Sequence, residues 1–278
     1  MWTKEVAFSI VPLIVLNALI VVGLAAFVTL RAMGKVKGES YRDEKFRATA
    51  VLGSTLRDFW GWFTGPIERA LIAAHVTPNM ITTMGLVLSA AAAVLYYLGH
   101  VGTAGYLVIL GGTCDTFDGR VARATGQQTR SGAFYDAVLD RVAESLIFIG
   151  IAGYYQHSAI LYIPLAALVG SLMVSYVRAR AEGMGVSCEE GLMQRPERIF
   201  LISICSLFDP LIKAIAVGRG YPDYHYVLIA AVSVIALLSW YTTFQRLIFG
   251  FRAIYAKYDE PALAAKRSEA IAVSSKAE

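Results

Sequence analysis

Residues 115–140, "DTFDGRVARATGQQTRSGAFYDAVLD", place four aspartates between two apolar stretches of the chain. Asp115 and Asp118 are three residues apart, and Asp136 and Asp140 are four residues apart. Residues with these spacings lie on one face of an α-helix. The stretch therefore predicts two helices, joined by a polar loop, whose acidic faces bring four carboxylates together.

The rest of the chain is apolar enough to be an integral membrane protein. Of its 278 residues 56% are hydrophobic and 17% are charged, and the mean hydropathy is +0.55. Such values exceed those of ordinary soluble proteins. A window of about 19 residues gives the candidate spans 7–30, 80–99, 101–122, 133–156, 159–181, 197–217 and 225–249. We expect an all-α membrane protein with a six-helix core and one extra N-terminal transmembrane helix.

Four segments follow from this pattern. We expect an N-terminal transmembrane anchor at 1–30, since this apolar run is longer than that of a signal peptide. A cytoplasmic juxtamembrane segment at 31–78, the catalytic membrane domain at 79–250 and a disordered tail at 251–278 complete the chain. In the juxtamembrane segment, Trp60, Trp62 and Phe63 beside charged residues favour an interfacial amphipathic helix, with a short soluble loop as the alternative. Thr77 or Asn79 is available to cap the helix that follows.

Basic residues mark one side of the membrane. Lys and Arg are frequent in 31–69, in the loop between the aspartate pairs, in 178–198 and after 246, whereas the connections near His100 and His157 have none. By the positive-inside rule the basic side, with the aspartates, faces the cytoplasm, which suggests the inner or plasma membrane. A net charge of +4 spread along the chain does not indicate nucleic-acid binding. The three cysteines lack metal-ligand spacing.

Four carboxylates held together repel one another unless a cation compensates them. Oxygen ligands without His or Cys suggest Mg²⁺, Mn²⁺ or Ca²⁺, and four carboxylates suit two ions of the kind that assist phosphoryl transfer. The simpler alternative is that the aspartates only pair with arginines at the helix ends, namely Arg120, Arg123, Arg130 and Arg141.

The motif Asp115-x2-Asp118-Gly119-x2-Ala122-Arg123-x8-Gly132-x3-Asp136-x3-Asp140 resembles the signature of the CDP-alcohol phosphotransferases. The resemblance covers about residues 65–250. It implies a membrane enzyme, usually a homodimer, that transfers a phosphate-linked group from a CDP-linked donor such as CDP-diacylglycerol to an alcohol and releases CMP. It also implies two ions, Mg²⁺ or Mn²⁺, on the four aspartates, and Asp140 as the base. The residues implied at the donor are Gly119, Ala122, Arg123, Gly132, Asn79 and Thr82.

Three later stretches resemble the bacterial phosphatidylinositol phosphate synthase branch: 175–185, 193–199 and 242–247. The resemblance implies a small anionic polyol, inositol phosphate, as the acceptor, with its phosphate bound by Arg178, Arg198 and Arg246. Arg195 shares a helical face with Arg198 and is a further candidate. The alternative is that these arginines only set topology, or that Arg178 pairs with Glu182. Phosphatidylglycerophosphate synthase, with glycerol 3-phosphate as acceptor, and a cardiolipin-type synthase are rival activities.

A divalent-cation transporter or channel also places acids inside a membrane protein. Transporters hold such acids near the middle of the bilayer, in broken helices. The aspartates here lie at the ends of their spans, which favours the enzyme.

Overall fold

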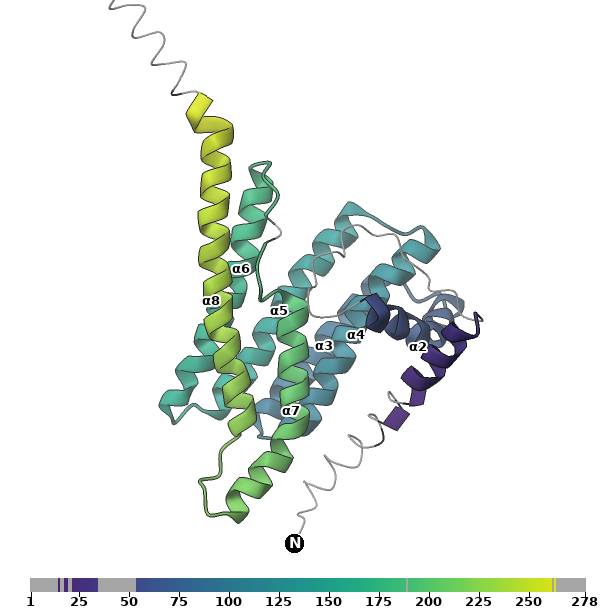
Figure 1. Ribbon diagram of the computed structural model, residues 1–278, viewed down its shortest axis with the longest axis vertical. Coiled ribbons are helices and arrows are strands. Elements are labelled where there is room, and N and C mark those ends of the chain that lie inside the picture. Colours follow the sequence, from purple (N-terminus) through teal and green to yellow (C-terminus); the bar gives the residue numbers. More distant parts are fainter. Residues whose placement is uncertain are drawn as a thin grey trace, which may run out of the picture.

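A computed structural model describes residues 15, 18–19, 22–34, 54–188, 190–261 and 263, and this part of the chain is helical without strands. A short apolar helix at Val22–Ala32 is followed by a series of longer helices (Figure 1). These are α2 (Ser54–Ala73), α3 (Pro78–Tyr97), α4 (Val101–Thr125), α5 (Arg130–Tyr154), η2 (Ala159–Leu161), α6 (Tyr162–Gly183), α7 (Arg195–Gly218), α8 (Tyr226–Ile254) and η3 (Tyr255–Asp259).

Within the described residues, four helical stretches are long and apolar enough to cross a membrane: Pro78–Tyr97, Ala159–Gly183, Arg195–Gly218 and Tyr226–Asp259. The expected spans 101–122 and 133–156 form α4 and α5, which have 25 residues each and carry the acidic motif. The helical core of an integral membrane protein is therefore confirmed. Half of the expected first span, 7–30, lies outside the described residues, and so does most of the tail.

The helical stretch that contains α8 runs past residue 250, where we expect the membrane domain to end. Helix α8 continues to Ile254, and η3 extends the helical stretch to Asp259. Lys257 and Tyr258 hold this extension against the loop after α6, because they donate hydrogen bonds to the carbonyls of Gly185 and Met184. The polar composition of the tail predicted disorder and gave no indication of these two contacts with the loop after α6.

The turns around the acidic motif are built from local signals. Thr77 caps α3 by accepting a hydrogen bond from the Met80 amide, and Thr129 caps α5 in the same way at Gly132. Helix α4 ends at Gly126, whose φ of +67° is strained for residues with a Cβ. Together they place the last turns of α4 beside the first turns of α5.

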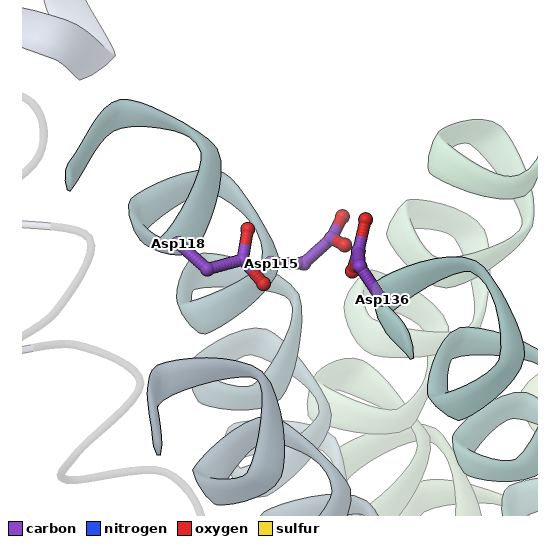
Figure 2. A group of neighbouring side chains, drawn as sticks. All are labelled: Asp115, Asp118 and Asp136. Atoms are coloured by element: carbon purple, nitrogen blue, oxygen red, sulfur yellow. The ribbon is translucent and has the colours of Figure 1, made fainter. Parts of the chain in front are cut away.

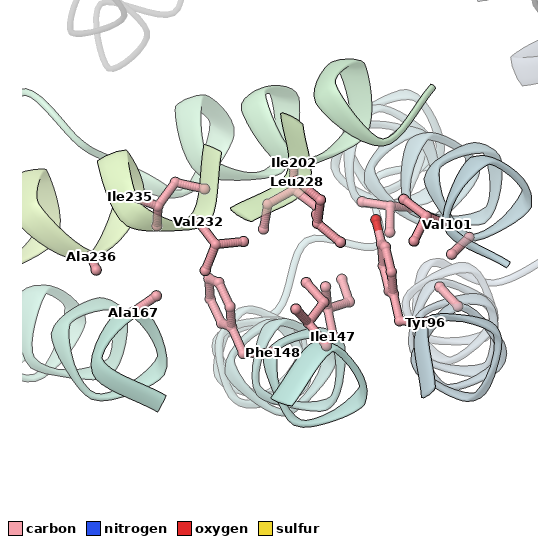
Figure 3. Packing of buried hydrophobic residues seen from close by; sticks show 14 of the residues in the cluster. Tyr96, Val101, Ile147, Phe148, Ala167, Ile202, Leu228, Val232, Ile235 and Ala236 are labelled. Atoms are coloured by element: carbon pink, nitrogen blue, oxygen red, sulfur yellow. The ribbon is translucent and has the colours of Figure 1, made fainter. Parts of the chain in front are cut away.

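The core lies where helices α3 to α8 meet, and Figure 3 shows part of it. Tyr96, Ile147 and Phe148 contribute large buried side chains from α3 and α5. Helices α3 and α5 approach closely at Gly150, where a Cβ would lie 2.2 Å from the carbonyl oxygen of Ala93. This close approach brings the N-terminal half of α3 alongside the acidic face of α5.

Helix α2 lies beside the core and joins it to the N-terminal helix segment (Figure 1). Phe27 is 1% exposed and packs against Phe59 and Trp62 of α2, with ring centroids 5.9 and 5.7 Å away. Arg120 of α4 donates a hydrogen bond to Thr64 and forms an ion pair with Glu68. The expected helix is confirmed, and the loop alternative is wrong; its position at the membrane surface stays a prediction.

The start of α8 is held by a side chain of α7. Asp209 is fully buried, and its Oδ1 accepts hydrogen bonds from the amides of Val227 and Leu228 at 2.9 and 3.0 Å. Its Oδ2 contacts His225 Nδ1. These free amides of the first turn of α8 therefore find their acceptor on the preceding helix rather than in a local cap.

Candidate active site

The acidic motif forms a compact cluster between α4 and α5. Asp115, Asp118 and Asp136 each offer a carboxylate oxygen, and these three oxygens all lie within 4.8 Å of one another. Figure 2 shows the two side chains of α4 and the one of α5 turned toward a common point. The helical spacing in the sequence and the short loop after Gly126 account for this meeting. The structure thus brings together three of the four aspartates that the sequence singled out.

Asp118 is held most firmly. It is 5% exposed, and its Oδ2 accepts a hydrogen bond of 2.7 Å from the Thr82 hydroxyl of α3. Its Oδ1 accepts a hydrogen bond from the Gly119 amide at 2.5 Å. A carboxylate with both oxygens engaged has little rotational freedom, so Asp118 is a fixed point of the cluster.

Asp140 lies one helical turn beyond Asp136 and has a different partner. Arg195, the first residue of α7, places Nη1 2.8 Å from Asp140 Oδ2 and 2.9 Å from Asp115 Oδ2. Arg141 also approaches Asp140, at 3.5 Å. Asp140 lies outside the three-acid cluster but is joined to it through Arg195, and Asp140, Asp115 and Asp118 line the same pocket.

The alternative, that the motif aspartates only pair with arginines at the helix ends, accounts for part of the contacts. Arg141 contacts Asp140, whereas Arg120 contacts Glu68 of α2 instead of an aspartate of the motif. The principal cation at the acids is Arg195, which comes from another helix. Asp115, Asp118 and Asp136 therefore form a group that local arginine pairing does not explain.

A divalent ion fits this group. All the donors are hard carboxylate oxygens, the type that Mg²⁺ and Mn²⁺ prefer. Oδ1 of Asp136 is buried and accepts no hydrogen bond within the described part of the chain. A buried carboxylate oxygen without a donor is costly, and a bound cation would compensate it.

The residues expected at the donor lie in the turns of α3, α4 and α5 nearest the acidic motif. Asn79 and Thr82 lie in the first turns of α3, and Gly132 lies in the first turn of α5. Gly119, Ala122 and Arg123 lie in the last turns of α4. A pocket continues from the acids into the bundle, and its lining includes Thr82, Gly85, Gly111, Asp118, Asp140 and Arg195. Gly85 and Gly111 let α3 and α4 pack closely beside the acids, since a Cβ at Gly85 would lie 3.4 Å from the Gly111 carbonyl oxygen.

The four arginines expected at the acceptor phosphate have different surroundings. Arg178 forms an ion pair with Glu182 at 2.8 Å, as the alternative interpretation had it. Arg246 donates hydrogen bonds to the carbonyls of Glu190 and Val174 and lies close enough to Arg178 to interact electrostatically. Both lie on the side of the molecule that carries the loop after α6.

Arg198 is fully buried and makes a paired contact with Glu144. Its Nε and Nη2 donate to the two carboxylate oxygens of Glu144 at 2.5 and 2.9 Å. Glu144 lies outside the sequence motif and was not among the predicted site residues. A signal was present, because Glu144 follows Asp140 by four residues and continues the acidic face of α5.

Comparisons with known proteins agree with this arrangement. The model of the family described as CDP-alcohol phosphatidyltransferase matches residues 75–236. A phosphatidylinositol phosphate synthase of Mycobacteroides abscessus is 33% identical over 200 residues, which cover 70% of this chain and 86% of that protein. An archaetidylinositol phosphate synthase of Methanothermobacter thermautotrophicus is 38% identical over 172 residues, covering 62% of this chain and 81% of that protein.

Solved structures show the same fold. The phosphatidylinositol phosphate synthase of Mycobacterium tuberculosis in complex with manganese and citrate is 28% identical, with a TM-score of 0.60. The match covers 68% of this chain and 88% of that one. The same enzyme with CDP-DAG bound gives a TM-score of 0.58 at 28% identity, over 70% of this chain and 94% of that one.

Proposed function

Because this chain belongs to the CDP-alcohol phosphatidyltransferase family, we propose that it transfers a phosphatidyl group from CDP-diacylglycerol to inositol phosphate and releases CMP. It is a membrane enzyme of the metal-dependent transferase type. The observation that carries the proposal is the meeting of Asp115, Asp118 and Asp136 at one point between α4 and α5.

The names of the relatives support the acceptor. The phosphatidylinositol phosphate synthases and the archaetidylinositol phosphate synthase differ in the lipid part of their names and share the inositol phosphate headgroup. The manganese and the CDP-DAG in the M. tuberculosis structures support a divalent ion and a CDP-linked lipid donor. The similarity of this chain to both kinds of synthase therefore favours the acceptor that they share.

The residues of the site suggest how the transfer proceeds. The acceptor hydroxyl oxygen forms a bond to the phosphorus of the phosphatidyl group, and the bond from that phosphorus to the CMP oxygen breaks. CMP leaves with the bonding electron pair, and Asp140 takes the hydroxyl proton as general base. Arg195, 2.8 Å from Asp140, orients this carboxylate. Thr82 and the Gly119 amide keep Asp118 in place beside it.

We assign two divalent ions to the site, Mg²⁺ or Mn²⁺. Asp115, Asp118, Asp136 and Asp140 would hold them, and carboxylate oxygens of the first three already lie within 4.8 Å of one another. Bound divalent ions compensate the negative charge of the phosphate groups during transfer. Gly119, Ala122, Arg123, Gly132 and Asn79 complete the proposed donor site.

For the acceptor phosphate we propose Arg178, Arg246 and Arg195. Guanidinium groups bind phosphate through paired, charge-assisted hydrogen bonds. The Arg178 side chain is 39% exposed, so an anion can replace its contact with Glu182. Arg198 is left out of this set, because the Glu144 carboxylate already compensates its charge, whereas Arg246, which is also buried, donates to two backbone carbonyls.

The setting of the enzyme in the cell is also part of the proposal. Basic residues around the motif favour an active site on the cytoplasmic face of the plasma membrane. The family resemblance favours a homodimer. Cysteine labelling from either side of intact vesicles and the mass of the protein in detergent test these two points.

An acceptor screen tests the function. The purified protein is given CDP-diacylglycerol and Mg²⁺ with inositol phosphate, inositol, glycerol 3-phosphate or phosphatidylglycerol, and CMP release is measured. We expect the highest kcat/KM with inositol phosphate and no turnover by Asp136→Asn, which provides the matched control. A preference for glycerol 3-phosphate would overturn the acceptor, and CMP release unaffected by Asp136→Asn would overturn the site.

A further inference from the structure

Two charged pairs link α5 to α7, one above the other. The outer pair is Asp140 with Arg195, and the inner pair is Glu144 with Arg198. The acids are four residues apart on α5 and the arginines are three apart on α7, so each helix presents both members on one face. The two pairs thus join the same helix faces at successive turns, and only the outer one reaches the motif.

The inner pair is closed to any ligand. The side chains of Arg198 and Glu144 are 1% and 3% exposed. Nε and Nη2 of Arg198 donate to Glu144, and Nη1 donates to the Met193 carbonyl at 2.9 Å. Each guanidinium nitrogen donates to an acceptor inside the protein, and the side chain is almost fully buried, so a substrate has no access to Arg198.

The same contacts fix the start of α7. Gln194 at the N-cap makes no side-chain capping hydrogen bond, so the helix lacks the usual local device. Arg198 instead reaches back to the carbonyl of Met193, and the Met193 amide donates to the Thr242 hydroxyl at 3.2 Å. The residue two positions before Arg195 is therefore held from α7 and from α8.

We propose that Glu144 and Arg198 are a pair of positioning residues that set the place of Arg195 against Asp115 and Asp140. Arg198 acts on the reaction through Arg195 and makes no contact with the acceptor phosphate. The proposal rests on the proposed function only in taking the aspartates as the reacting centre. Its physical basis is the rigidity of the buried, two-point ion pair between Glu144 and Arg198, which lies one helical turn from the contact of Arg195 with the aspartates.

Mn²⁺ binding without substrates provides the test, since it does not depend on the acceptor. Arg195 competes with a cation for the carboxylates of Asp115 and Asp140. We therefore expect Arg195→Gln to lower the Kd for Mn²⁺, by about fivefold or more. Glu144→Gln and Arg198→Gln loosen Arg195, so each should lower the Kd in the same direction, by about threefold. In the Arg195→Gln background, Glu144→Gln should then change the Kd less than twofold.

Substrate kinetics separate positioning from phosphate binding. Glu144→Gln and Arg198→Gln should lower kcat together and leave the ratio of kcat/KM for inositol phosphate to that for inositol unchanged. A rise in the inositol phosphate KM confined to Arg198→Gln, with unaltered Mn²⁺ binding, would overturn the proposal. The proposal would also be overturned if Glu144→Gln changed the Kd for Mn²⁺ by the same factor in the wild-type and the Arg195→Gln backgrounds.

Loss of one partner leaves a buried charge uncompensated, so a single variant can fail to fold. The double variant Glu144→Leu/Arg198→Met removes both charges and keeps similar volumes. If it folds and binds Mn²⁺ as the wild type does, the proposal is wrong; a lowered Kd supports it. If the variants change Mn²⁺ binding as expected but the wild-type protein makes no product with inositol phosphate, the proposed function alone is refuted.

Discussion

Replacing Thr82 by valine removes the hydroxyl that donates to Asp118 at 2.7 Å and leaves the rest of the side chain in place. A hydrogen bond to a charged group contributes about 1.5–3 kcal/mol, which corresponds to roughly 10- to 150-fold in an equilibrium constant. Loss of a residue that supports a metal ligand typically costs about 10- to 100-fold in metal affinity. Both estimates predict a Kd for Mn²⁺ at least about tenfold higher, because Asp118 would lose its fixed orientation.

Thr83→Val provides the matched control, because Thr83 is the next residue of α3 and bonds to the Asn79 carbonyl and to Tyr135 instead of an aspartate. Mn²⁺ titration by calorimetry in detergent gives the two Kd values, and CMP release at limiting and saturating Mn²⁺ gives the activities. Thr82→Val should lose activity mainly at limiting Mn²⁺. Equal Kd values for the two variants would refute the role of Thr82 as a support for Asp118.

Other changes test separate parts of the molecule. Asp140→Asn should keep CDP-diacylglycerol binding and lower kcat about 10²- to 10⁴-fold if Asp140 is the base, whereas lost donor binding would contradict that role. Gly150→Ala forces a Cβ within 2.2 Å of the Ala93 carbonyl oxygen, so we expect it to destabilise the protein by about 2 kcal/mol in thermal unfolding. Gly65→Ala, with open space around it, should be neutral or stabilising, and similar melting temperatures for the two would contradict the packing argument. EDTA should abolish CMP release, and added Mn²⁺ or Mg²⁺ should restore it; activity that survives chelation would refute the metal site. Burial raises the pKa of the Cys188 thiol, so its thiolate forms only at higher pH and alkylation in the folded protein should be slow at pH 7.5 and accelerate on denaturation.

The sequence was most informative where function depends on spacing along one helix. Asp115 with Asp118, and Asp136 on the next helix, were predictable because the 3.6-residue period fixes which side chains share a face. The cap at Thr77 was predictable for a similar reason, since a capping side chain acts within three residues of itself.

Contacts between helices were beyond the sequence. Thr82 and Asp118 are 36 residues apart, and Glu144 and Arg198 are 54 apart. A membrane helix that is apolar on nearly all sides gives no strong signal of which face turns inward, so the partner of a buried arginine cannot be read from periodicity. The family resemblance grouped Arg198 with Arg178 and Arg246, and nothing in the sequence distinguished their partners. In the structure Arg178 pairs with Glu182, Arg198 pairs with the buried Glu144, and Arg246 donates to two backbone carbonyls.

The contact of Asp209 with the start of α8 bears on how the protein is made. Helix α8 follows α7 during synthesis, and two of its first amides depend on a carboxylate that α7 already carries. If α7 entered the membrane alone, Asp209 would be a charge in an apolar setting without its donors, which is unfavourable. We therefore expect α7 and α8 to insert into the bilayer together, as one hairpin. When a ribosome stalls before residue 226, α7 of the nascent chain should not yet be inserted in the membrane.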